Sequence, residues 1–106
     1  MAMFVGVLRI SLHLHGNGSL KGKRSMVRRI VERTRSKFNA SVAEVADNDV
    51  LQRAVIGITV VGNSASHLDS MIGRIGGFVE GLGVAPVSSI QTEVIPLGGD
   101  IGDPDW

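Results

Sequence analysis

The fold is decided by residues 4–38, which read FVGVLRISLHLHGNGSLKGKRSMVRRIVERTRSKF. Residues 4–14 alternate between an apolar face and a mixed face, and this period of two is typical of a β-strand. Apolar residues then recur at helical spacing, which predicts a helix over residues 20–37. Ser19 can cap this helix, because its hydroxyl can accept a hydrogen bond from a free amide of the first turn.

The rest of the chain contains three more strand patterns and one more helix pattern. Strands are expected over residues 40–47 and 51–62, and the second of these is apolar on both faces in its middle, as a central strand would be. A second helix follows, with Ser66 and Asp69 at the spacing of a capping box. The last strand is expected over residues 87–95.

This order predicts an α+β fold, the ferredoxin-like βαββαβ sandwich. In this fold a four-stranded antiparallel sheet carries two helices on one face, and the first and third strands are central. A chain of 106 residues is one domain. We expect residues 1–96 to form it, and residues 97–106, which are rich in Gly, Pro and Asp, to form a loose tail.

The face of the sheet without helices is predicted to bind a second copy of the chain. From the first strand it would carry Val5, Val7, Arg9, Ser11 and His13, and from the third strand Val55 and Val61. This face is too apolar to be wholly solvated, so we expect a homodimer through it.

Residues 21–37 hold eight of the eleven basic residues of the chain, opposed only by Glu32. On a helical wheel one flank comprises Lys21, Arg24, Arg28 and Arg35, and a second basic patch comprises Arg29 and Arg33. The flank could be a solvated face whose long stems cover the edge of the core. Alternatively, it could contact RNA phosphates, an acidic protein or a small phosphorylated ligand.

The start of the same helix is a candidate anion site. Ser19 stands beside Lys21, Lys23 and Arg24, where free amides and the positive end of the helix dipole converge. The segment lacks the spacing of a Walker loop, so nucleotide hydrolysis is not expected.

Other residues offer little for catalysis or for a cofactor. The chain has no cysteine, and neither a Ser-His-Asp order nor a carboxylate pair stands out. His13 and His15 have same-face spacing on a strand, but no third metal ligand is placed, and neither a metal nor a cofactor is expected. Glu44 and Arg53 are expected to form an ion pair across neighbouring strands.

The chain resembles the bacterial YlxP-like proteins, a family of unknown function, over about residues 3–95. The resemblance rests on the segments SLK and KR at residues 19–24, FN at 38–39, VAEV at 42–45 and QRA at 52–54. Gly22 departs from it, since a charged residue is expected there. The resemblance implies a ferredoxin-like fold, a cytoplasmic location and a role near RNA or the ribosome.

Together these observations favour a non-enzymatic binding module that contacts RNA, or a ribosome- or translation-associated protein, through its basic helix. The open face of the sheet lacks the aromatic residues on which RNA-binding sheets stack bases, so contact is expected from the helix and the loops. No apolar stretch approaches the length of a membrane-spanning helix, and no membrane partner is expected.

Overall fold

A computed structural model describes residues 2–97 of the chain. Its strands are β1 (Met3–His13), β2 (Ser41–Ala46), β3 (Arg53–Gly62) and β4 (Val87–Leu97), and its helices are α1 (Leu20–Lys37) and α2 (Ala65–Gly81). The element order is the predicted βαββαβ, and the bounds of α1 are those expected from the sequence.

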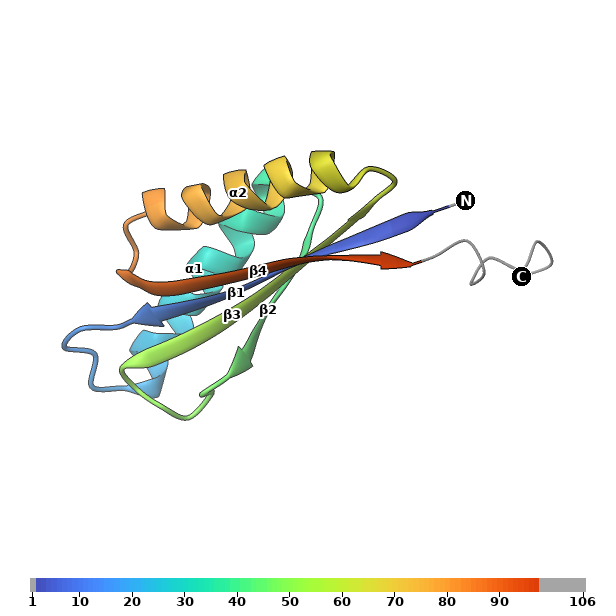
Figure 1. The fold of residues 1–106 in the computed structure, drawn as a ribbon. Coiled ribbons are helices and arrows are strands. Elements are labelled where there is room, and N and C mark those ends of the chain that lie inside the picture. The colour runs from blue at the N-terminus through green and yellow to red at the C-terminus, as the bar shows by residue number, and fades with distance from the viewer. Residues whose placement is uncertain (1, 98–106) are drawn as a thin grey trace.

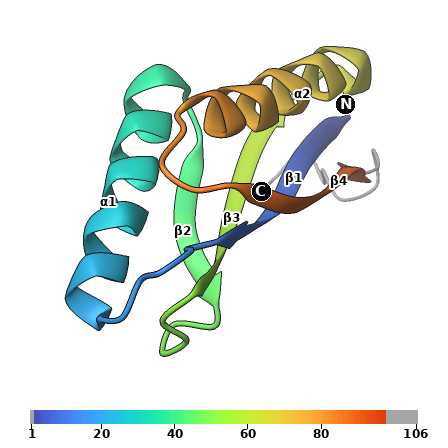
Figure 2. The ribbon, with the colours of Figure 1, turned by 90° about the vertical axis from the view of Figure 1, so that its left-hand side faces the viewer.

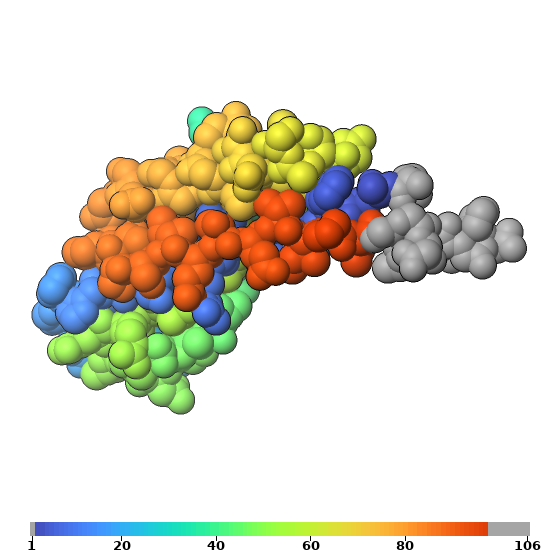
Figure 3. All heavy atoms as spheres, viewed as in Figure 1, coloured from blue at the N-terminus to red at the C-terminus, as the bar shows by residue number. Residues whose placement is uncertain are grey.

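The strands form one antiparallel sheet in the order β2-β3-β1-β4, so β1 and β3 are central, as predicted. Both helices lie on one side of this sheet, α1 beside β2 and α2 across β1 (Figures 1 and 2). Within residues 2–97, no helix lies on the other side of the sheet, which we call the open face (Figure 2). In the space-filling view, β4 forms a band along the flank of the molecule below α2 (Figure 3).

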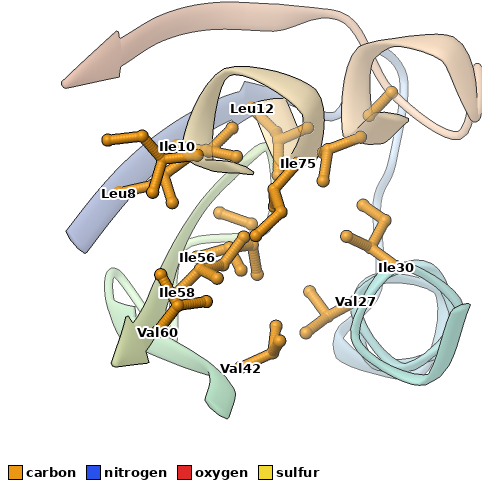
Figure 4. Close-up of a cluster of buried hydrophobic side chains, with 14 of the residues drawn as sticks. Leu8, Ile10, Leu12, Val27, Ile30, Val42, Ile56, Ile58, Val60 and Ile75 are labelled. Carbon is orange, nitrogen blue, oxygen red and sulfur yellow. The ribbon is translucent and has the colours of Figure 1, made fainter. Parts of the chain in front are cut away.

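The core lies between the sheet and the helices, where the inward positions of the central strands meet one face of each helix (Figure 4). Its members include Leu8, Ile10, Leu12, Val27, Ile30, Ile56, Ile58, Val60 and Ile75. Burial of each such side chain contributes roughly 1.5–3 kcal/mol. The period-two pattern of β1 therefore fixes which face of the sheet the helices cover.

Gly6 allows α2 to approach β1 closely. A Cβ at this position would lie 3.0 Å from the side chains of both Ile72 on α2 and Val60 on β3. The glycine within the first strand pattern is thus explained by packing, because a larger residue would push the helix away from the sheet.

Three boundaries differ from the expectation by two residues, and the other strand ends differ by at most one. The cap of α2 is Ser64, whose Oγ accepts from the His67 amide at 3.3 Å, so the predicted capping box at Ser66 and Asp69 is wrong. The third strand begins at Arg53, because the two residues before it belong to a turn. The last strand continues through Leu97, and the predicted loose tail otherwise lies outside the described residues.

Candidate functional site

The start of α1 is built around a buried asparagine. Ser19 caps the helix as predicted, and its Oγ accepts from the Gly22 amide at 3.0 Å. Asn17 Nδ2 donates to the carbonyl oxygens of Ser19 (2.9 Å) and Leu51 (2.6 Å), which ties this cap to the turn between β2 and β3. Gly22 leaves room for this asparagine, since a Cβ would collide with Asn17 Oδ1 and displace the side chain from these hydrogen bonds. The departure from the family pattern at Gly22 therefore has a local packing reason.

Lys23 lies inside the protein, so the prediction that it contacts an anion in solvent is wrong. Its side chain is 1% exposed, and Nζ lies 3.0 Å from Glu44 Oε2. The ammonium also donates to the carbonyl oxygens of Asp47 and, at 2.7 Å, of Val50. Lys23 thus holds the β2–β3 turn against the first turns of α1.

The helical spacing explains why Lys23 points inward. Its position is four residues before Val27 and seven before Ile30, and both of these are core residues on the buried side of α1. This signal was present in the sequence, because the spacing alone places Lys23 on the apolar face.

The predicted ion pair between Glu44 and Arg53 is also wrong, because the two side chains leave opposite faces of the sheet. Glu44 pairs in register with the core residue Ile56 and faces α1, whereas Arg53 pairs with the exposed His13. Arg53 Nε instead donates to Asp47 Oδ2 at 2.7 Å. This hydrogen bond and the negative charge of Asp47 raise the pKa of Arg53.

The solvent side of α1 brings together most of the predicted basic flank. Lys21, Arg24 and Arg28 line a shallow hollow of about 470 Å³ together with Ser25, and all four residues are exposed. Within residues 2–97, the ion pairs at 4.0 Å or less involve Lys23 and Arg53, so none of these three cations is neutralised by a carboxylate. We call Lys21, Arg24 and Arg28 the basic row.

The remaining basic residues of the helix lie apart from this hollow. Arg35 is exposed two turns beyond Arg28, about 10 Å along the helix axis, and does not line the hollow. Arg29 and Arg33 are also exposed, and the helical angle of 100° per residue places them on the adjacent side. They form a second patch of two cations on the same helix.

The histidines do not assemble a metal site among the described residues. The rings of His13 and His15 lie 4.0 Å apart between centroids, and both residues are exposed. No group of three His, Asp or Glu side chains that could hold a metal ion occurs in residues 2–97. The same part of the chain has no helix long and apolar enough to span a membrane.

The open face carries the five predicted residues of β1, namely Val5, Val7, Arg9, Ser11 and His13, which alternate with the core positions. Val55 and Val61 of β3 pair in register with Ser11 and Val5 and share this face. The described Phe residues lie elsewhere: Phe4, Phe38 and Phe78 pack against the core, the last two edge to face. Dimerisation through this face stays a prediction.

Comparison with known proteins gives a family without an assigned activity. The model of a family described as "Protein of unknown function (DUF503)" matches residues 5–92. The uncharacterized protein YlxP of Bacillus subtilis (strain 168) is 32% identical over 76 residues, which cover 72% of this chain and 83% of the relative.

Two solved structures of designed proteins have a similar fold. Foldit4 has a TM-score of 0.51 at 15% identity, covering 91% of this chain and 97% of the designed one. LFR1 1, a design with a ferredoxin fold, has a TM-score of 0.51 at 16% identity, covering 86% and 83%. The likeness to both concerns the fold alone. Since the family model matches most of the sequence and the YlxP relative covers nearly three quarters of it, the chain belongs to the DUF503 family of unknown function.

Proposed function

We propose that this protein is a binding module that contacts the phosphate backbone of RNA through the solvent side of α1. The observation that carries the proposal is the hollow lined by the basic row, whose three cations have no carboxylate partner within residues 2–97. Cations in this state can neutralise phosphates and release their counterions, which is the main source of sequence-independent affinity for nucleic acids.

The length of the basic flank favours a polymer over a small ligand. With Arg35, which lies on the same flank beyond the hollow, the cations extend over about 21 Å of the helix, a length that suits several phosphates of a polymer better than one phosphorylated metabolite. The inward position of Lys23 removes one of the charges that would have concentrated on one anion at the helix start. A row of separate cations suits a backbone that carries one charge per nucleotide.

The surface favours contact with phosphates over reading of bases. The open-face residues of the described strands include no Phe, Tyr or Trp, the side chains that usually stack unpaired bases in sheet-based recognition, and His13 at the end of β1 is the one imidazole among them. RNA is the polymer that the resemblance to YlxP-like proteins implies. We therefore expect binding that depends strongly on salt and weakly on sequence.

The experiment that tests this proposal compares two double charge reversals on the same helix. Arg24→Glu/Arg28→Glu alters the basic row, whereas Arg29→Glu/Arg33→Glu changes the net charge equally on the adjacent patch. Fluorescence anisotropy of labelled RNAs is measured from about 50 to 200 mM salt. The first variant should lose roughly tenfold to a hundredfold in affinity at about 0.1 M salt, and its salt slope should fall by about one per cation removed.

The matched variant separates a defined surface from a general effect of charge. It should retain affinity within about threefold of the parent, because its cations lie outside the hollow. Equal losses in the two variants, or no loss in the first, would rule out the basic row as the RNA contact. Pull-downs with and without nuclease add a second criterion, since partners that persist after nuclease digestion would indicate an acidic protein instead.

A further inference from the structure

The open face of the sheet carries apolar side chains that no helix of residues 2–97 covers. Val5, Val7, Val45, Val61 and Ile95 all lie on it, on all four strands. Val61 is 67% exposed and Val45 is 54% exposed, although β-branched residues of this kind are normally covered. A sheet face that exposes several large apolar side chains is typical of a contact with another molecule.

The charges of this face are balanced within it. Arg9 of β1 pairs in register with Gln91 of β4, to which its Nε donates at 2.7 Å, and Glu93 is the next open-face residue along β4. The other cation at the margin, Arg53, is already paired with Asp47. The centre of the face therefore offers one unpaired charge of each sign, side by side.

This balance selects the kind of partner. A strongly acidic or basic protein would gain little from a face with equal and opposite charges. A second copy of the same face would form two ion pairs with it. A two-fold axis that passes between Arg9 and Glu93 places Arg9 of each copy opposite Glu93 of the other copy. Two hollows of about 260 and 300 Å³, both bordered by Val7, give this surface recesses for side chains of the facing copy.

We propose that the open face binds the open face of a second copy, in a two-fold dimer in which Arg9 of each copy pairs with Glu93 of the other. Both helices lie on the far side of the sheet, so each α1 stays exposed at the outer surface (Figure 2). The two basic rows, which would repel each other in contact, are then separated by both sheets. This proposal concerns a different surface from the RNA contact and stands or falls separately.

The test uses charge reversals that are complementary only between chains. Arg9→Glu gives a face with two acids, and Glu93→Arg gives a face with two bases. Each variant alone should dimerise at least roughly tenfold more weakly than the parent, because like charges then meet across the two-fold axis. An equimolar mixture of the two should recover the parental dissociation constant within about threefold, because both contacts in the mixed dimer become ion pairs.

Sedimentation velocity over a concentration series measures the association of the whole chain, and circular dichroism checks that each variant is folded. The control exchanges Arg74→Glu and Glu80→Arg, two exposed residues of opposite charge on α2, and should leave association unchanged. A parent chain that is monomeric at about 100 µM, far above the range of a specific dimer, would overturn the proposal. The proposal would also fail if the mixture of the two variants associated as weakly as each variant alone, because Arg9 and Glu93 would then not pair between chains.

Discussion

At Lys23, the place of the residue on the helix decides its role more than its charge does. A single lysine on the apolar side of α1 can be buried only because Glu44 supplies a counter-charge and two turn carbonyls accept the remaining donors. The contact joins the first turns of α1 to the β2–β3 turn. The residue therefore belongs to the framework that orients the basic row, rather than to the row.

Replacement of Lys23 should therefore destabilise the fold. Lys23→Met leaves the Glu44 carboxylate largely buried without its counter-ion and should lower the free energy of unfolding by about 3–5 kcal/mol. Lys23→Met/Glu44→Leu should recover most of this loss, since an apolar pair can replace a buried ion pair at little cost. Urea denaturation measures the free energy of unfolding of both variants. Lys21→Met is the control at an exposed position, and its free energy of unfolding should lie within about 0.5 kcal/mol of the parent. Equal midpoints for Lys23→Met and Lys21→Met would contradict the burial of Lys23.

At the scale of the elements, the cap of α2 gives the sharpest prediction. Both Ser64 and Ser66 precede the apolar pattern of this helix, but only Ser64 has the extended backbone of a cap and accepts from the His67 amide. Ser64→Ala should lower the free energy of unfolding by about 1 kcal/mol, whereas Ser66→Ala should change it by less than about 0.5 kcal/mol. Thermal or urea unfolding of the two variants in parallel measures this difference, and a larger effect at Ser66 would restore the capping box.

The helices and strands also show which parts of the fold can be predicted from the sequence alone. Period two and helical spacing are local, so they were sufficient for all six elements and for the full extent of α1. The register between β2 and β3 is not local: a shift between Glu44 and Ala46, together with the positive φ of Asp47, sets which carboxylate meets Arg53. For Lys23 the helical spacing indicates burial whereas the charge indicates exposure, and only the contact with Glu44 on β2 shows how both are satisfied.

At the scale of the whole molecule, the two proposals combine into a bivalent binder. Sheet-to-sheet pairing would leave one basic row at each outer surface of the dimer, so an RNA long enough to reach both rows could bind with higher avidity than a short one. An RNA of about ten nucleotides, the scale of one single-strand site, would contact one row only. If the chain dimerises through the open face and binds RNA through α1, its affinity should therefore rise with the length of the RNA.

Glu93→Arg makes this link testable, because charge and avidity predict opposite results. The substitution raises the formal net charge of each chain from +1 to +3, since a base replaces an acid. If charge alone governed binding, affinity would rise for every RNA. If the dimer matters, affinity for a long RNA should fall by at least about tenfold, with no such fall for the short one. Anisotropy over a length series measures this difference.

Addition of the Arg9→Glu chain should restore the affinity for long RNA, because the two variants form a mixed dimer. If the affinity were not restored, RNA binding would not depend on dimerisation.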